Sequence, residues 1–425
     1  MEKFQKFVKD TKVKFSKLKN SFVIESRIRF DEFFATSFWL LNAIGYDFRK
    51  FKDATTKSEK INIALHNAHY WFGNIIIVLL VIFSELELWC GPTTNLSKRL
   101  FGTALLMTYF INQYRILSFW YNKSKLMDIL TKLKKSYPKS YPSALAICGA
   151  FKIVQAIFVG VNSVMASVTL IPVLRWLITG DRTFIVPFPN YFTCDFIYPF
   201  VLIWSNYVGI YGIYLITSIM LMTSILITTI SVEFYSLSDK IKNLKDMTEK
   251  EIELELPKLI KNHQKTFELV HDLKDIFSET FFFRFIVSAS LIGLNLFQLQ
   301  TTENVFENSI FLIYTCFEIG QVFLQCYFGQ FLIDASEKIA DEVYNCGWEN
   351  WQRISLKKKL VNVLQRAQKP AVLTIWKFGV ISMRQFTWIM DSAYNLTSLI
   401  MKLNLQFYNN LIKNLSENFC INSCR

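Results

Sequence analysis

Two histidines three residues apart, His66 and His69, form the arrangement in this sequence that comes nearest to a metal-binding motif. Residues at this spacing lie on one face of a helix, so both ring nitrogens could reach a single ion. A metal site needs further ligands, and no carboxylate or third ligand accompanies the pair at a suitable spacing. Such rings at the edge of an apolar stretch are more typical of a membrane interface. We therefore expect no metal site.

Catalytic motifs are also missing from the chain. It contains no Gly-x-Ser-x-Gly, no His-Glu-x-x-His and no phosphate-binding glycine loop. Few ionisable residues lie in the middle of the apolar stretches, where placing each one costs about 3 kcal/mol or more. The two halves also lack the matching Gly/Pro-broken segments of an alternating-access transporter. These observations predict neither an enzyme nor a bound cofactor.

The clearest polar pattern is a stripe in the last apolar stretch. Five side chains recur at steps of seven, four, three and four residues, which places them on one helical face: Arg384, Asp391, Asn395, Ser398 and Lys402. Leu399 and Leu403 run beside them. In lipid this face must meet other helices or water. It is therefore either a hydrogen-bonded helix contact or the wall of a pore that the leucines close by dewetting.

A second group of residues is aromatic. A proline-stiffened loop, 184–191, could cover a cavity between neighbouring helices. Below it, apolar side chains with a few hydroxyl and indole groups would suit a small volatile organic ligand: Phe101, Leu105, Met165, Thr169, Trp204, Tyr207, Tyr211, Phe311 and Tyr314. The alternative for each of these residues is that it fills the bundle or anchors at the membrane interface.

Seven apolar stretches must position these groups, because each is long enough to cross the hydrocarbon core at about 20 residues. They are 70–90, 100–120, 148–171, 197–222, 281–299, 309–333 and 372–401. The predicted fold is an all-α membrane protein with seven transmembrane helices. The first 30 residues show no secretory signal, and the pattern there predicts either an amphipathic helix on the inner leaflet or a solvated helix packed on the inner loops.

The basic residues indicate the orientation. Of 47 Lys and Arg, 35 fall in the four segments that face one side and 7 in those that face the other. This bias predicts an N-terminus inside and a C-terminus outside. The net charge of +13 then belongs to loops that face acidic lipid headgroups, and no nucleic acid is expected as a partner.

The predicted organisation has six parts. They are a cytoplasmic N-terminal region 1–69, spans 1–4 with the outer pocket in 70–232, a cytoplasmic loop or helix 233–280, spans 5–6 with a cytoplasmic anchor in 281–371, a pore-lining span 372–402, and an extracellular tail 403–425. In this orientation Asn95 and Asn414 are glycosylation acceptors on the outer side. Cys90, Cys194, Cys420 and Cys424 also face outward, with or without a disulfide.

The region after residue 326 resembles the C-terminal signature of insect odorant receptors. The matching segments follow one another at the family's spacing: Tyr327-Phe-Gly-Gln330, Tyr344-Asn-Cys-Gly-Trp348, Arg366-Ala-Gln-Lys-Pro370 and Ser392-Ala-Tyr394. The earlier part of the chain matches that family in its pattern of spans more than in motifs.

The resemblance implies a subunit of a tetrameric, odorant-gated, nonselective cation channel in the dendrite membrane of a sensory neuron. The pocket is then enclosed by spans two, three, four and six. The short loop after span four resembles that of a ligand-binding subunit, which has an odorant co-receptor as its partner.

The resemblance also assigns roles to residues. It implies an anchor for assembly at Tyr344, Trp348, Arg366, Pro370 and Tyr394, and a hydrophobic gate at Leu399 and Leu403. The gate lies beside the polar stripe, so the predicted pore also includes Asn395, Ser398 and Lys402. Lys402 departs from expectation, because a positive charge beside a gate repels cations. The apolar residues of the tail beyond 403 have no assigned role. A G-protein-coupled receptor, a gustatory-receptor-like channel and a transporter or structural subunit remain as alternatives.

Overall fold

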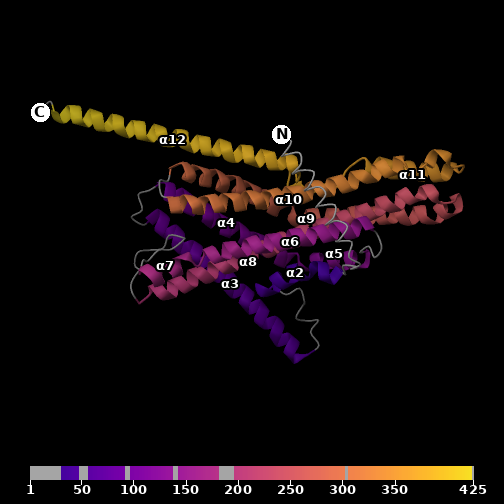
Figure 1. Cartoon of the computed structure of the whole chain (residues 1–425), viewed down its shortest axis with the longest axis horizontal. Helices are drawn as coiled ribbons and strands as arrows, with labels where there is room; N and C mark the ends of the chain where they lie inside the picture. Colours follow the sequence, from indigo (N-terminus) through magenta and orange to yellow (C-terminus); the bar gives the residue numbers. More distant parts are fainter. Residues whose placement is uncertain are drawn as a thin grey trace, which may run out of the picture.

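A computed structural model describes residues 30–46, 56–90, 96–136, 142–180, 196–301 and 305–423 of the chain. These segments are almost entirely helical (Figure 1). The helices are α2 (Phe30–Ala43), α3 (Lys57–Cys90), α4 (Leu96–Tyr121), α5 (Lys123–Ser136), α6 (Pro142–Val168), α7 (Ile171–Thr179), α8 (Tyr198–Lys242), α9 (Glu249–Thr301), α10 (Val305–Tyr344), α11 (Ile354–Ala367) and α12 (Met383–Ser423). Two short 3-10 helices, η3 (Asn243–Asp246) and η4 (Trp348–Asn350), interrupt the connections.

Five helical segments in the described part of the chain are long and apolar enough to cross a membrane: Lys57–Ser84, Gly149–Thr179, Tyr198–Asp246, Glu249–Thr301 and Phe311–Asn350. Many of their large apolar side chains are exposed on the outside of the bundle, as expected for a surface that faces lipid. Helices α4 and α12 cover the remaining predicted spans and have 26 and 41 residues, which is sufficient length. The protein is an all-α membrane protein.

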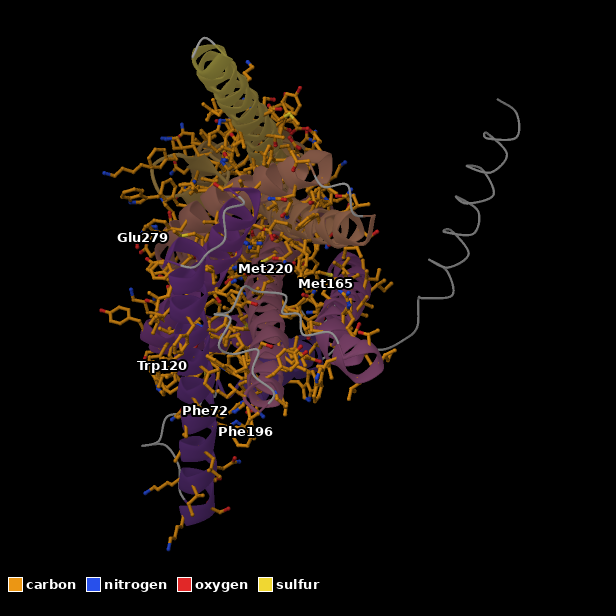
Figure 2. The ribbon with its side chains drawn as sticks, turned by 90° about the vertical axis from the view of Figure 1, so that its left-hand side faces the viewer. Phe72, Trp120, Met165, Phe196, Met220 and Glu279 are labelled. Atoms are coloured by element: carbon orange, nitrogen blue, oxygen red, sulfur yellow. The ribbon has the colours of Figure 1, made fainter. Side chains whose placement is uncertain are left out.

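Helix α8 forms the centre of the bundle. In its apolar segment 94 % of the residues are buried, compared with 33 % in α3, which lies at the outside. Figure 2 shows Met220 of α8 near the middle of the molecule, and this side chain is fully buried. Apolar side chains from almost every helix join one continuous core around α8.

Helices α8, α9 and α10 are much longer than a hydrocarbon core requires, since 45 residues of helix extend about 68 Å and the core is about 30 Å thick. Their far ends pack together with α11 at one end of the molecule (Figure 1). The predicted loop 233–280 is therefore two continuations of helix joined by a short turn at η3. At the start of α9 the carboxylate of Glu251 accepts hydrogen bonds from the backbone N–H and the hydroxyl of Thr248.

The seventh predicted span begins later than expected. Residues 372–382 are apolar, but they form a small antiparallel hairpin, with β1 (Thr374–Ile375) paired to β2 (Gly379–Val380). The hairpin packs against α9 through a hydrogen bond from the backbone N–H of Trp376 to Oγ of Ser278 (2.7 Å). Helix α12 then starts at Met383, so the prediction of helix from 372 is wrong for its first eleven residues.

Candidate ligand-binding cavity

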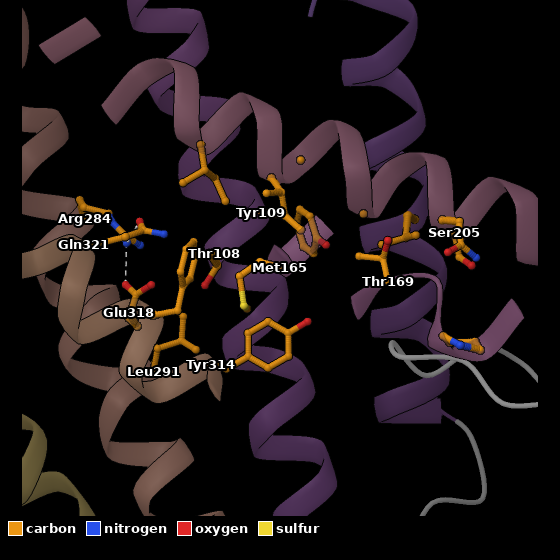
Figure 3. A pocket seen from close by; sticks show the side chains of 18 residues that line it. Thr108, Tyr109, Met165, Thr169, Ser205, Arg284, Leu291, Tyr314, Glu318 and Gln321 are labelled. Carbon is orange, nitrogen blue, oxygen red and sulfur yellow. Dashed lines mark hydrogen bonds and ion pairs between the residues drawn. The ribbon is translucent and has the colours of Figure 1, made fainter. Parts of the chain in front are cut away.

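A cavity of about 120 Å³ lies inside the bundle, in the half where α4, α6, α8 and α10 meet (Figure 3). It is comparable with the ~150 Å³ apolar cavity that accepts benzene in a soluble protein. Its lining comes from seven segments of the fold: Leu80, Thr108, Tyr109, Met165, Thr169, Pro172, Ser205, Asn206, Gly209, Gly212, Ile213, Ile216, Arg284, Leu291, Tyr314, Phe317, Glu318 and Gln321.

Glycines on α8 create space on one side of this cavity. A Cβ atom built at Gly209 would lie 2.9 Å from Cγ2 of Thr169, and one at Gly212 would lie 3.0 Å from Cε1 of Tyr109. Both distances are shorter than normal carbon contacts, which are about 3.5–4.0 Å. Side chains at these two positions would push Thr169 and Tyr109 out of place.

The two ends of the cavity differ in chemistry. At one end, Nη2 of Arg284 lies 2.7 Å from Oε1 of Glu318 and donates to Oε1 of Gln321 at 2.8 Å. The hydroxyl of Ser288 also donates to Oε1 of Glu318 at 2.7 Å. Met165 and Tyr314 provide a thioether and a ring in the middle of the cavity, and Thr169 and Ser205 provide hydroxyl groups at the other end (Figure 3). The cavity is therefore mainly apolar with one buried ionic end.

Three of the nine predicted pocket residues, Met165, Thr169 and Tyr314, line this cavity together. Phe311 does not, although it is on the same helix as Tyr314. Phe101 and Leu105 belong to α4, but their side chains lie outside the described part of the structure.

Trp204, Tyr207 and Tyr211 do not line the cavity, which corrects their predicted placement. At steps of three and four residues they share a face of α8 that packs against α3. The ring of Trp204 meets Phe83 edge-on at 6.0 Å, and Tyr207 stacks on Tyr211 at 5.9 Å. The hydroxyl of Tyr211 donates to the carbonyl of Tyr70 at 3.3 Å. These three side chains hold α3 to α8.

Arg284, Glu318 and Gln321 were not predicted as site residues. The signal was present, because Arg284 and Glu318 are charged residues inside the apolar stretches 281–299 and 309–333. Intramembrane charges usually face the interior and pair with one another. Sequence alone did not show that these two, 34 positions apart, lie side by side.

The polar stripe of α12 points away from the bundle. Arg384, Asp391, Asn395 and Lys402 are exposed and Ser398 is half-buried. The opposite face of the helix packs on α9 and α10 through the buried side chains Ile389, Ala393 and Thr397. Since these faces lie on opposite sides of the helix, the stripe is turned away from α9 and α10.

Leu399 and Leu403, beside the stripe, are 54 % and 56 % exposed. Figure 1 shows α12 leaving the bundle and continuing to the C-terminus. Its helix includes Asn414, whose side chain is outside the described residues, as is all of Asn95.

The residues expected to act in assembly differ in their surroundings. Tyr344 and Tyr394 are two-thirds exposed, whereas Trp348 is partly buried against the core. Pro370 is half-buried between α11 and the hairpin. The guanidinium of Arg366 lies 3.6 Å from the centre of the Phe267 ring, a cation–π contact that ties α11 to α9.

His263 lies beside this contact, in the part of α9 that precedes the predicted span. Its ring meets Phe267 edge-on at 4.9 Å and also faces Phe234. Burial, together with the positive charge of Arg366, lowers the pKa of His263 to about 4. The imidazole is therefore neutral at physiological pH.

The histidines and cysteines of the described residues do not form a metal site. In the described residues, no group of three His, Cys, Asp or Glu side chains could hold a metal ion. His69 packs edge-on against Tyr211 at 5.9 Å. Cys316, Cys326 and Cys346 are free thiols, and the side chains of the outward-facing cysteines lie outside the described parts.

Comparison with known proteins identifies the family. The family model described as 7tm Odorant receptor matches residues 95–394. Odorant receptor 85f of Drosophila melanogaster is 22 % identical over 400 residues, covering 87 % of this chain and 95 % of that protein. Odorant receptor 13a of the same species is 27 % identical over 223 residues, which are 46 % of this chain and 53 % of that relative. The match therefore spans only about half the length of the second protein.

The fold also matches a solved structure. The insect olfactory receptor OR5 from Machilis hrabei, solved in complex with eugenol, superposes with a TM-score of 0.75 at 14 % identity, covering 88 % of this chain and 98 % of that one. A second solved structure of the same receptor superposes with a TM-score of 0.74 at 12 % identity. The family match covers well over half of the chain. The protein belongs to the insect odorant receptor family, and it is a membrane receptor and not an enzyme.

Proposed function

We propose that this chain is the ligand-binding subunit of an odorant-gated, nonselective cation channel. It assembles with a co-receptor as a heterotetramer in the dendrite membrane of a sensory neuron. The observation that carries this proposal is the polar stripe of α12, which is turned away from α9 and α10 and includes the exposed Asn395 and the half-buried Ser398. A stripe of this kind needs water or other subunits, and a central pore provides both.

The ligand is a small volatile organic molecule. The cavity is lined mainly by apolar surface with a few convergent polar groups, as is usual for small-molecule sites. Its hydroxyls and rings, including Tyr109, Tyr314 and Ser205, can orient a ligand that is otherwise recognised by shape. Eugenol in the related Machilis receptor is a molecule of this class.

Helix α9 connects the cavity with the proposed pore helix. Leu291 lines the cavity, and two residues later Gly293 packs against α12, where a Cβ atom would lie 2.8 Å from the carbonyl oxygen of Ala393. Ligand binding that moves α9 would therefore move α12. In this mechanism the ligand opens the pore by favouring the position of α9 in which Leu399 and Leu403 no longer close it.

Lys402 is exposed on the same stripe. Four copies of this charge around one axis would repel cations, so a ring in which co-receptor subunits supply most of the four positions suits a cation channel better. Tyr344 and Tyr394, both exposed, are available for contacts with neighbouring subunits.

The test is expression of the chain with and without a co-receptor while a panel of volatiles is applied. A channel predicts cation current within milliseconds of ligand addition, without any requirement for nucleotide. Current that depends on a G protein would instead support a metabotropic receptor. Absence of any ligand-evoked current in the co-expressing cells would favour a transporter or structural subunit.

Topology gives an independent test. A tag at the N-terminus should be inaccessible on intact cells, while Asn95 and Asn414 should accept glycans. An N-terminus that antibodies reach from outside would contradict the channel orientation and would fit the metabotropic alternative.

A further inference from the structure

The charged end of the cavity, formed by Arg284 and Glu318, lies near a second buried guanidinium group, that of Arg115. Arg284 and Arg115 are 1 % and 3 % exposed, and both side chains remain protonated in proteins. Arg115 is attracted by the negative charge of Glu318 and repelled by the positive charge of Arg284. The carboxylate of Glu318, which is already paired with Arg284, is therefore also the negative charge that acts on Arg115. Buried charges are normally paired, because an isolated one is costly.

Hydrogen bonding at this end is also incomplete. Nε of Arg284 and Nη1 of Arg115 are buried and have no acceptor among the described residues. The contact that Arg115 does make is to the thioether sulfur of Met220, at 3.8 Å, and sulfur is a weak acceptor. Most buried donors in folded proteins have a partner, so donors without one beside a cavity indicate a missing acceptor.

Arg284 places this charge within reach of a ligand. It lines the cavity directly, and Figure 3 shows its side chain at the end opposite Thr169 and Ser205. Its Nη2 is occupied by Glu318 and Gln321, whereas Nε is free to donate. The rest of the cavity is mainly apolar with a few hydroxyl groups, and has room for a short hydrocarbon chain or one ring.

We propose that the cavity recognises a small monocarboxylate, with its anionic group on Arg284 and its hydrocarbon part among Met165, Leu291 and Tyr314. The ligand would supply both the acceptor that Arg284 lacks and the negative charge that balances Arg115. This inference rests on the proposed function, because it names the chemical class of the odorant. Neutral odorants of the same size would fit the apolar part but leave the charge unbalanced.

Two isomeric probes separate charge from shape. Pentanoate and the neutral ester methyl butanoate have the same number of non-hydrogen atoms, and only the first is an anion at neutral pH. The full chain is purified together with its co-receptor in lipid nanodiscs, and the thermal unfolding midpoint is measured against the concentration of each probe. Pentanoate should bind at least tenfold more tightly than the ester, as expected for a hydrogen bond to a charged group.

Two variants on the charged end give opposite predictions. Glu318→Gln keeps an acceptor for Ser288 but removes the competing negative charge, and should increase the apparent affinity for pentanoate about tenfold while leaving that for the ester unchanged. Arg284→Gln should abolish the preference for pentanoate. If Arg284→Gln fails to fold, the Glu318→Gln result alone decides. Leu291→Met, on the same helix as Arg284, should change the affinities for pentanoate and for the ester by the same factor.

The outcomes also separate this inference from the channel proposal. Equal or tighter binding of the ester, no binding of pentanoate, or no change in Glu318→Gln would overturn the carboxylate site. Pentanoate binding without current from any volatile would refute the channel and leave the carboxylate site standing. Current evoked by neutral volatiles, with no stabilisation by pentanoate, would support the channel and refute the carboxylate site.

Discussion

The hydroxyl of Thr397 on α12 donates a hydrogen bond to the backbone carbonyl oxygen of Gly293 on α9, at 2.9 Å. The same hydroxyl also lies 3.0 Å from the carbonyl of Ala393, one turn earlier on its own helix. The absence of a side chain at Gly293 permits this approach, since Leu396 is also close to the position a Cβ atom would take. The contact joins the helix that lines the cavity to the helix that carries the polar stripe.

Gly293→Ala should uncouple the two helices. The added methyl group would lie 2.8 Å from the carbonyl oxygen of Ala393, which is backbone and cannot move aside without shifting α12. We expect ligand-evoked current to change several-fold while ligand binding stays the same, measured by recording and by ligand-induced thermal stabilisation. Gly320→Ala on α10 is the matched control, because nothing lies within 4 Å of its new methyl group. Identical currents in the two variants would exclude coupling through this contact.

Gly209→Ala should reduce sensitivity to the ligand without changing permeation. Its methyl group would press on Thr169 and narrow the cavity, and a small apolar site distinguishes changes of one methylene by about 1–3 kcal/mol. Dose–response curves and reversal potentials measure the two properties separately. Gly160→Ala on α6 has open space around it and serves as the control. A shifted reversal potential with an unchanged dose response would place Gly209 outside the ligand site.

The arrangement of spans was largely readable from hydropathy, but the orientation of each helix about its axis was not. Helix α8 is apolar all round, so periodicity does not distinguish the face with Trp204, Tyr207 and Tyr211 from the face with Ser205, Gly209 and Gly212. The second face lines the cavity, and its small residues give no signal in a search for aromatic contacts. Trp204→Ala is expected to weaken the packing of α3 on α8.

Two other features depended on tertiary contacts. Residues 372–382 have the hydropathy of a span, but they form a hairpin that contacts with other helices hold in place. Ser278 of α9 accepts a hydrogen bond from the hairpin, and Oε1 of Gln330 on α10 accepts one from the backbone N–H of Met383 at 3.4 Å. The pairing of Arg284 with Glu318 likewise arises only when α9 and α10 pack together. The polar stripe of α12 was visible in the sequence because helical spacing alone defines a face.

Leu399→Ala should increase the resting leak several-fold. The side chain is exposed beside the polar stripe, where a ring of leucines from the assembled subunits would keep water out of a closed pore. Whole-cell current without ligand measures the effect, and Leu403→Ala should act in the same direction. If both variants keep the leak and the gating of the unmodified chain, Leu399 and Leu403 do not form the gate.

The packing around His263 should weaken as the pH falls. Because its pKa is about 4 in the folded chain and 6.5 ordinarily, the unfolded state binds the proton more readily between these values. The neutral ring contributes on the order of 3 kcal/mol to the free energy of unfolding above pH 6.5, and this contribution is lost progressively as the pH falls toward 4. Thermal unfolding across this range measures it. His263→Gln should flatten the dependence, and an equally steep profile in that variant would assign the effect to other groups.

Cysteine accessibility can show whether the polar stripe of α12 faces an aqueous pore. Asn395→Cys is compared with Ile389→Cys, which lies on the fully buried face of the same helix. Each variant is co-expressed with a co-receptor and treated with a charged thiol reagent while ligand-evoked current is recorded. If the stripe lines the pore, the reagent should block the current rapidly at Asn395→Cys and should have no effect at Ile389→Cys or in the unmodified chain. Equal block at both positions, or none at Asn395→Cys, would contradict this arrangement.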